Sequence, residues 1–443
     1  MNTFMDSLVR QVNFTETENG AVAHKSTLNK VYDMFALGGA YRQRTDEDCI
    51  LLFKNALEED KTLALKCLFY LRDIRGGQGE RRFFRVCFNW LAKNYPEIAR
   101  RNLVNLAEYG RYDDLYCVVG TPVEKDMFAL IREQLEKDIT SMNESEKAGV
   151  SLLAKWLKSE NASSKETKIL GNKTRIALGL THKAYREILS ALRTRINIVE
   201  KLMSERKFHE IEYSKIPSKA GLIYRNAFAK RDAERYKEFM ASKETKVNAG
   251  VNYPYEMVRE VTKHLNHYFW QEDYQWTEEE RNALDKYWSQ QKDYLQGKPC
   301  KMMGVIDTSG SMTWQGVGAV KPIDVAVSLG IYAAQRNKGA FANHYISFSR
   351  EPRFVECEGV DFVDMVERIV ATDLCENTNL DKVFDLLLDT VKNGAKQTDL
   401  PSRLVVISDM QIDEATRGGW YDHGNEWNQD NSRRNMEIIR EKW

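Results

Sequence analysis

The first part of the chain carries apolar residues at the spacing of an α-helix. Over residues 26–270 they recur on one helical face in segments that short breakers such as Gly76-Gly77 and Pro217 separate. This pattern predicts helices that include residues 46–58, 61–72, 82–94, 96–109 and 127–140. Because one pair of amphipathic helices cannot bury its apolar faces alone, we expect an all-α, HEAT-like solenoid of stacked antiparallel helix pairs over residues 26–270.

Beyond residue 300 the pattern changes to alternating strands and helices. Short apolar runs predict strands at 302–306, 343–348 and 403–407, and amphipathic stretches predict helices at 323–336, 360–370 and 380–391. This alternation is typical of an α/β domain with a parallel sheet covered on both faces. Residues 1–25 are polar and predict an arm, and residues 271–300, with one helix at 277–291, predict a connecting segment before an α/β domain over residues 301–443.

Composition narrows the classes of protein that remain. The 443 residues include 65 basic and 65 acidic ones, so the whole chain offers no bulk charge for a polyanionic partner. Residues 151–250 nevertheless carry 22 Lys and Arg against 11 Asp and Glu, a net charge of +11. The absence of a long apolar run and of a signal-peptide pattern predicts a cytoplasmic protein without membrane contact. Seven scattered cysteines without a CxxC pair are expected to be reduced and structural.

A turn rich in oxygen ligands follows the first predicted strand. The segment MGVIDTSGSM runs from an apolar strand into a turn that holds Asp307, Ser309 and Ser311. Asp409 follows the last predicted strand in the same way, and Thr378 lies between them where a helix begins. Carboxylate and hydroxyl oxygens suit a hard cation, so we expect Mg²⁺, or another divalent cation such as Mn²⁺ or Ca²⁺, at these five residues. The alternative for an isolated DxSxS sequence is an ordinary turn.

This set of residues resembles the metal-ion-dependent adhesion site of von Willebrand factor A domains. The resemblance implies a Rossmann-like A domain with the cation at its strand ends. Two features depart from that pattern: Glu376-Asn377 stands where Gly-Gly commonly precedes the Thr, and the chain continues by only one predicted helix past the Asp409 strand. An A domain usually continues through two more strands, so the domain is expected to be shortened at its C-terminus.

The helical part carries two further sequence blocks, LRDIRGGQGERRFF at 71–84 and AEYGRYDDL at 107–115. On a structural reading, arginines such as Arg72 pair with nearby carboxylates such as Asp113 and Asp114. Together with stretches such as SLLAKWLKSENASS, the blocks resemble an uncharacterised family of bacterial, viral and plant proteins related to the TROVE module of Ro ribonucleoproteins. That resemblance implies a ring of helical repeats closed by the A domain, which binds small structured RNAs outside and single-stranded RNA ends in its hole.

The basic stretch of the chain supplies candidate RNA contacts. Cations neutralise phosphates and aromatic faces stack on unpaired bases, which favours single-stranded or loop RNA. The alternative is that these cations decorate solvated helix faces. The candidates combine both side-chain types and are Lys155, Trp156, Lys158, His182, Lys183, Tyr185, Arg186, Arg193, Arg195, Lys219, Arg225, Lys230 and Arg231.

Three functions follow as hypotheses. The first is an RNA-binding ribonucleoprotein component whose A domain closes the ring or docks partners. The second is a metal-dependent protein-interaction scaffold, in which the cation's open position accepts an Asp or Glu of a protein partner. The third, a metal-dependent phosphohydrolase, is disfavoured because position 309 is Ser and no Ser/His/Asp or Cys/His arrangement is recognisable, so we expect no enzyme.

Overall fold

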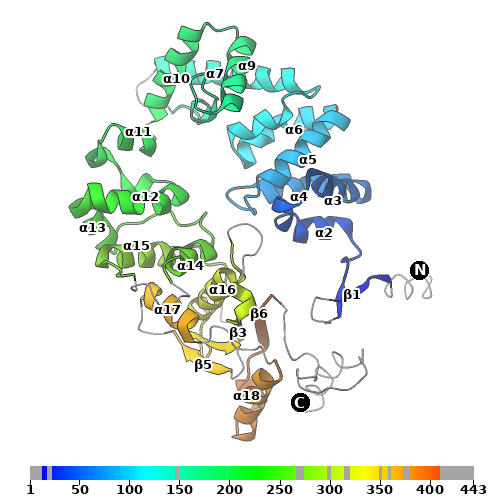
Figure 1. The fold of residues 1–443 in the computed structure, drawn as a ribbon, viewed down its shortest axis with the longest axis vertical. Coiled ribbons are helices and arrows are strands. Elements are labelled where there is room, and N and C mark those ends of the chain that lie inside the picture. The colour runs from blue at the N-terminus through cyan, green and yellow to red at the C-terminus, as the bar shows by residue number, and fades with distance from the viewer. Residues whose placement is uncertain are drawn as a thin grey trace. The chain divides into compact units, whose positions relative to one another are not determined.

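A computed structural model divides the chain into two compact units (Figure 1). The helical unit comprises residues 26–211, and the mixed unit comprises residues 1–25 together with residues 212–443. The structure describes residues 12–16, 22–144, 149–196, 198–265, 274–296, 301–313, 320–348, 352–357, 361–372 and 380–409. The chain is therefore mostly helical, with a small mixed sheet in its C-terminal part. This agrees with the predicted order of a helical region followed by a region of strands and helices.

The helical unit consists of α-helices joined by short turns and 3₁₀ helices. Its described elements are α2 (Lys30–Leu37), η1 (Ala40–Gln43), α3 (Asp46–Glu59), α4 (Lys61–Arg72), α5 (Arg82–Asn94), α6 (Pro96–Tyr109), η2 (Tyr112–Val118), α7 (Glu124–Glu144), α8 (Leu153–Trp156), α9 (Lys165–Leu178), α10 (His182–Ile196), α11 (Val199–Ser204) and η3 (Phe208–Glu210). The predicted helices at 61–72, 82–94 and 96–109 are confirmed with the same bounds.

Capping side chains explain where several of these helices begin and end. Thr45 accepts a hydrogen bond from the Asp48 amide ahead of α3, and Asp60 accepts one from the Leu63 amide ahead of α4. At the other end of α9, Gly179 adopts a left-handed conformation with φ of 71°, which favours glycine. No helix in the described part of the chain is long and apolar enough to cross a membrane.

A buried ion-pair network joins α4, α5 and η2 in the helical unit. Arg72 is only 2% exposed, and its Nε and Nη2 donate to Asp114 Oδ2 at 2.8 and 2.6 Å. Arg85 donates to Asp114 at 2.6 Å and to Asp113 at 2.8 Å. The two sequence blocks at 71–84 and 107–115 thus meet inside the core, and the structural reading of Arg72 is confirmed.

The mixed unit combines helices with two small sheets. Its described elements are β1 (Phe14–Glu16), β2 (Val22–His24), η4 (Tyr213–Lys215), α12 (Ser218–Arg231), α13 (Ala233–Ala241), α14 (Pro254–Thr262), α15 (Glu278–Ser289), β3 (Met302–Asp307), η5 (Gly310–Thr313), α16 (Pro322–Arg336), β4 (His344–Phe348), β5 (Arg353–Glu356), α17 (Phe362–Thr372), α18 (Leu380–Lys392), η6 (Gln397–Asp399) and β6 (Arg403–Ile407).

The helices α12 to α15 fall in the mixed unit, although the sequence placed most of them in the first domain. The cause is their contact with the helices of the sheet. The Thr262 hydroxyl on α14 donates to Asp324 of α16 at 2.7 Å, where both residues are buried. Arg281 on α15 donates to Asp361 and Asp364 at 2.7 Å each. Periodicity along the chain identifies these helices but does not show against which neighbour each one packs.

The main sheet has the strand order β5-β4-β3-β6. Strand β3 pairs in parallel with β4 and with β6, whereas β4 and β5 are antiparallel. The prediction of a parallel sheet is therefore correct for the three predicted strands, but the sheet is mixed. Strand β5 was missed because it is four residues long and largely exposed, so it gives no apolar run. The short β1-β2 pair within residues 1–25 was missed as well.

Helices cover both faces of β3. Met303 and Val305 point to one face and share a core with Val383 and Leu387 of α18. Gly304 and Ile306 point to the other face, where α16 approaches closely because its residue 330 is glycine. A Cβ atom at position 330 would lie 2.0 Å from Cδ1 of Ile306. Gly330 therefore sets the distance between α16 and the strand that ends at Asp307.

We predict that Gly330→Ala lowers the free energy of unfolding by about 1–3 kcal/mol, because the new methyl group overlaps Ile306 in a packed core. Chemical denaturation monitored by circular dichroism measures this loss. The combined variant Gly330→Ala with Ile306→Val removes Cδ1 and should recover part of it. Gly250→Ala is the matched control, because a Cβ atom there meets nothing within 4 Å. Equal stability of the two single variants would contradict the close packing.

Candidate metal centre

The register of the sheet brings two aspartates to one edge. Strand β3 ends at Asp307, and its parallel neighbour β6 ends at Ile407, which pairs with Ile306. Ser408 therefore follows its strand at the same level as Asp307, and Asp409 is the next residue of that loop. Carboxyl ends of neighbouring parallel strands are a common place for ligand sites in α/β sheets.

Hydrogen bonds hold the Asp307 carboxylate in a fixed orientation. The Ser408 hydroxyl donates to its Oδ2 at 2.5 Å, and the Ser309 amide donates to its Oδ1 at 2.9 Å. Asp307 is fully buried, and Ser309 is 5% exposed. The hydroxyl oxygens of Ser309 and Ser311 lie 3.1 Å apart, so the turn presents two neutral oxygen ligands next to the carboxylate. We call Asp307, Ser309, Ser311 and Asp409 the strand-end cluster.

A methionine joins the two loops of the cluster. Met312 lies in η5, is 2% exposed, and its amide donates to the Ser309 carbonyl at 3.1 Å. Its sulfur accepts a hydrogen bond from the Asp409 amide at 3.3 Å. The backbone of the second loop is thereby fixed to the first turn, which keeps both aspartates at the same edge.

The electrostatics of the cluster favour a bound cation. Burial raises the pKa of the Asp307 carboxyl above its ordinary value, and the nearby Asp409 carboxylate raises this pKa further, while the hydrogen bonds from Ser408 and Ser309 lower it. A divalent cation would offset both the desolvation and the repulsion between carboxylates. The Thr308 hydroxyl is also buried and has no hydrogen-bond partner among the described residues, so this turn has one more polar group that a ligand or water can bind.

The structure brings together four of the five predicted metal ligands, namely those of the strand-end cluster. The fifth, Thr378, lies outside the described residues. No group of three or more His, Cys, Asp and Glu residues that could hold a metal occurs in the described ranges. The cluster itself has two carboxylates, so a cation there would take its other ligands from hydroxyls and water. Such a ligand set fits Mg²⁺, which keeps several waters. Sequence reasoning missed Ser408 and Met312, although Ser408 directly precedes a predicted ligand.

The predicted RNA contacts around α8 are engaged within the helical unit. Lys155 pairs with Glu200 at 3.6 Å, and its Nζ lies 5.6 Å from the ring centroid of Trp156. The Trp156 ring also carries the Arg111 guanidinium at 4.0 Å, and Lys158 lies 5.4 Å from the ring of Tyr116. The aromatic and cationic side chains that suggested base stacking thus stack on each other.

Some of the predicted RNA contacts on helix α10 are buried, and others are exposed. Tyr185 is fully buried and donates to the Lys158 carbonyl at 2.8 Å, so its ring is not exposed for stacking on a base. Arg193 is partly buried and donates to the carbonyls of Ala154 and Leu157 at 2.8 and 3.0 Å. The other predicted residues of α10 are exposed or partly exposed, namely His182, Lys183, Arg186 and Arg195. His182 contacts Glu160, and Lys183 lies near Glu187.

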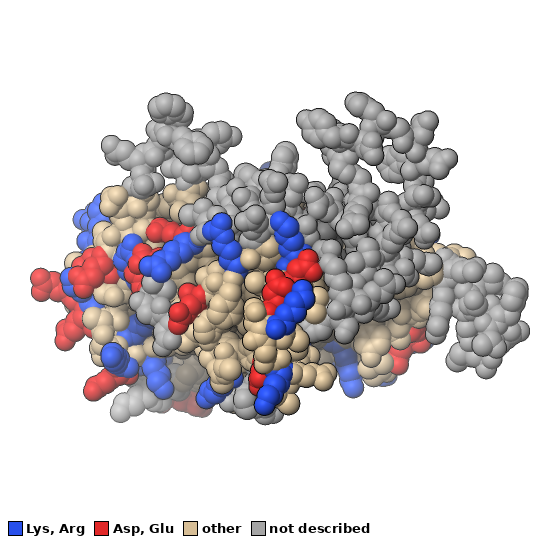
Figure 2. Space-filling view, turned by 90° about the horizontal axis from the view of Figure 1, so that it is seen from below, with Lys and Arg blue, Asp and Glu red and all other residues tan. Residues whose placement is uncertain are grey.

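The predicted contacts on α12 belong to the mixed unit. Arg225 is 6% exposed and pairs with Glu260, so burial also removes it from any surface contact. Lys219 pairs with Glu256 at 2.9 Å. Lys230 and Arg231 are exposed and form no ion pair with any described residue. Among the residues that Figure 2 colours, acidic and basic side chains are interspersed on the face shown.

The described cysteines do not contribute to a site. They are free thiols, and burial raises the pKa of Cys67 to about 11 and that of Cys357 to about 12. A thiol with a raised pKa stays protonated and is a poor nucleophile or metal ligand at neutral pH. The expectation of structural cysteines agrees with these positions, while Cys300 and Cys375 lie outside the described residues.

The fold and the cluster define a large helical protein with a small mixed sheet that has carboxylate and hydroxyl side chains at its strand ends. The chain belongs to the family described as Domain of unknown function (DUF2828), whose model matches residues 17–127 and 159–298. Residues 301–443 match a second model, Domain of unknown function (DUF7788). The chain is similar to an uncharacterized protein of Acanthamoeba polyphaga mimivirus, with 28% identity over 449 residues, which cover 92% of this chain and 74% of the viral protein.

These comparisons correct the resemblance drawn from the sequence. The matching models are those of the two domains of unknown function, and not those of the TROVE module or of the von Willebrand factor A domain. The family assignment from sequence motifs is therefore wrong. Short motifs such as DxSxS recur in unrelated chains, so they indicate local chemistry better than ancestry. The strand-end cluster stands on its own geometry.

We predict that Asp307→Asn and Asp409→Asn each weaken Mg²⁺ binding by about tenfold or more, because each removes a charged ligand from a site with two carboxylates. Isothermal titration calorimetry of the full chain measures this. Glu356→Gln is the control, because Glu356 is an exposed carboxylate on strand β5 of the same sheet. If all three variants bound Mg²⁺ as the original chain does, the cluster would not be the metal site.

Proposed function

We propose that this chain is a Mg²⁺-dependent binding protein that recognises an acidic side chain of a protein partner. The observation that carries the proposal is the position of Asp307 and Asp409 at neighbouring parallel strand ends, with the hydroxyls of Ser309 and Ser311 beside them. A cation held by few protein ligands keeps open positions, and the Asp or Glu carboxylate of a partner can take one of them.

The residues around the cluster favour binding over hydrolysis. Its immediate neighbours are Ser408, Thr308 and Met312, and none of these is a general base at neutral pH. The Ser309 and Ser311 hydroxyls are paired with each other, and the Ser408 hydroxyl donates to Asp307, the carboxylate that a bound cation would also use. A cation in this environment attracts an anionic group of a partner and fixes the orientation of that group, which is what specific binding requires.

The helices serve this proposal as a scaffold. In the helical unit, α3 packs on α4 and α5 packs on α6, and a single residue, Asp60 or Tyr95, separates the two helices of each pair. Consecutive antiparallel pairs of this kind support a stacked, solenoid-like arrangement that presents long helix faces. The sheet of the mixed unit, with helices on both faces of β3, supports a Rossmann-like arrangement.

The proposal predicts a set of partner proteins whose retention depends on both the metal and the cluster. The full chain is immobilised and exposed to a lysate in Mg²⁺, and the retained proteins are identified by mass spectrometry before and after EDTA. We expect proteins that EDTA releases and that Asp307→Asn fails to retain, because the cation bridges the two carboxylate groups. Glu356→Gln should retain the same set, since it keeps the cluster. If the same proteins were retained after EDTA treatment and by Asp307→Asn, the proposal would be contradicted.

RNA binding by the helical unit is the second candidate function, and one observation favours it. Arg186, Arg193 and Lys201 line a hollow of 230 Å³ beside α10. Arg193 forms no salt bridge with any described carboxylate, so its charge is balanced only by the carbonyls that it contacts. A phosphate group would supply the missing negative charge, and the net charge of +11 over residues 151–250 supports the same partner.

For this candidate we expect a labelled single-stranded oligouridine to bind with an affinity that falls steeply as salt rises, measured by fluorescence anisotropy. Arg186→Gln should weaken binding and reduce the salt slope by about one, as the loss of one phosphate contact does. Lys66→Gln, which removes an exposed cation on α4, should change neither value. Binding that is absent, or flat with salt, would exclude RNA as the ligand of this face.

A further inference from the structure

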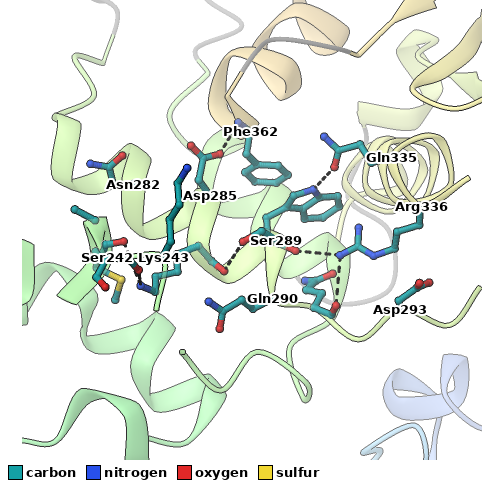
Figure 3. Close-up of a pocket in the computed structure, with 15 residues that line it drawn as sticks. Ser242, Lys243, Asn282, Asp285, Ser289, Gln290, Asp293, Gln335, Arg336 and Phe362 are labelled. Atoms are coloured by element: carbon teal, nitrogen blue, oxygen red, sulfur yellow. Dashed lines mark hydrogen bonds between the residues drawn. The ribbon is translucent and has the colours of Figure 1, made fainter. Parts of the chain in front are cut away.

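A large pocket lies in the mixed unit, and none of the residues of the strand-end cluster lines it. It has a volume of 760 Å³, within the range of small-molecule sites, and its walls come from the ends of α13, α15 and α16 and the start of α17. Figure 3 shows Arg336 and Asp293 at one side of the pocket and Asn282, Ser242 and Lys243 at the other.

The pocket contains a fixed cation without an acidic partner. Arg336 lies 4.2 Å from the ring centroid of Tyr332 and 5.7 Å from that of Trp288, and its Nη2 donates to the carbonyls of Trp288 and Gln291 at 3.1 and 3.4 Å. No described carboxylate forms a salt bridge with Arg336. Burial lowers the pKa of its guanidinium, and although Tyr332 and Asp293 raise this pKa, no described carboxylate pairs directly with the charge. An anion would do so.

Asp293 supplies that anion only in part, because its carboxylate raises the pKa of Arg336 from a distance and forms no salt bridge with it. Its carboxylate oxygen Oδ1 accepts hydrogen bonds from the amides of Leu295 and Gln296 at 2.9 and 3.1 Å, so it is turned into its own loop. Lys286, another cation of the lining, is used within the protein, because its ammonium donates to the carbonyls of Phe239 and Ser242 at 2.6 Å each. Arg336, together with the exposed Lys243 on the opposite wall, therefore remains available for an anionic ligand.

Neutral polar groups of the lining also lack partners. Gln291 is 7% exposed, and neither its Oε1 nor its Nε2 has a hydrogen-bond partner. A buried amide with both atoms unsatisfied is costly, and a ligand with hydroxyl groups would remove this cost by forming the missing hydrogen bonds. Asn282, partly exposed on the opposite side, has no hydrogen bond to a described residue either. Amides of this kind both donate to and accept from hydroxyl groups.

We propose that this pocket binds a phosphorylated polyhydroxyl compound of the sugar-phosphate class. Arg336 binds the phosphate, and the amides of Gln291 and Asn282 bind hydroxyls. A guanidinium matches the geometry of phosphate oxygens, and the excess of neutral amides and hydroxyls in the lining matches a polyol better than an apolar ligand. The site is separate from the strand-end cluster and does not depend on a metal there.

Isothermal titration calorimetry of the full chain tests this with ribose 5-phosphate and glucose 6-phosphate as probes, in the presence of EDTA. We expect at least one sugar phosphate to bind more tightly than inorganic phosphate, and ribose without phosphate to bind undetectably. Arg336→Gln should weaken the probe by about tenfold or more, since a hydrogen bond to a charged group is lost. Lys338→Gln, an exposed cation two residues away and outside the lining, should leave affinity unchanged.

A second variant separates binding from stability, because Arg336 also contacts the end of α15 and its loss can affect folding. Gln291→Leu removes an amide that forms no hydrogen bond, so the melting temperature should stay constant or rise while the sugar phosphate binds several-fold more weakly. Unchanged affinity in Gln291→Leu and Arg336→Gln, or binding of both probes no tighter than that of inorganic phosphate, would overturn the proposal.

Discussion

The parallel pairing of β3 with β6 is the constraint on which the candidate site depends. One register, with Ile306 opposite Ile407, places Asp307 and Asp409 at the same edge of the sheet. A shift by one residue would turn the buried side chains of β3 to the opposite face, so the core on both sides fixes this register. Gly330 of α16 and the apolar residues of α18 thus determine the site geometry although they do not touch the aspartates.

The helical unit is stabilised by a different kind of contact. Its core contains the fully buried pair of Arg72 and Asp114, with Arg85 on the same carboxylate. Breaking such a pair leaves one uncompensated buried charge, which is far more costly than losing a surface pair. This explains why the sequence concentrates arginines and aspartates at 71–85 and 111–114. It also limits which cations of this unit remain for an external ligand.

The sequence was sufficient for local structure and for the residues at the strand ends. Caps such as Thr45 and Asp60 and the apolar runs of β3 and β6 are local signals, and these runs also place Asp307 and Asp409 after neighbouring strands. Tertiary packing explains the failures. Tyr185 and Arg225 occupy positions that periodicity does not distinguish from surface ones, yet both are buried. The pocket around Arg336 joins residues from Met240 to Phe362, which lie more than one hundred positions apart, and no local pattern can indicate this.

The central claim is that the strand-end cluster holds a divalent cation. Anomalous diffraction from crystals of the full chain grown with Mn²⁺, as a substitute for Mg²⁺, tests it most directly. We expect a strong anomalous peak between Asp409 and the turn of Asp307, Ser309 and Ser311. The Mn²⁺ ion should lie about 2.0–2.3 Å from side-chain oxygens of these residues, or contact them through one bound water. An ordered cluster without a peak, in crystals that bind Mn²⁺ elsewhere on the chain, would contradict it.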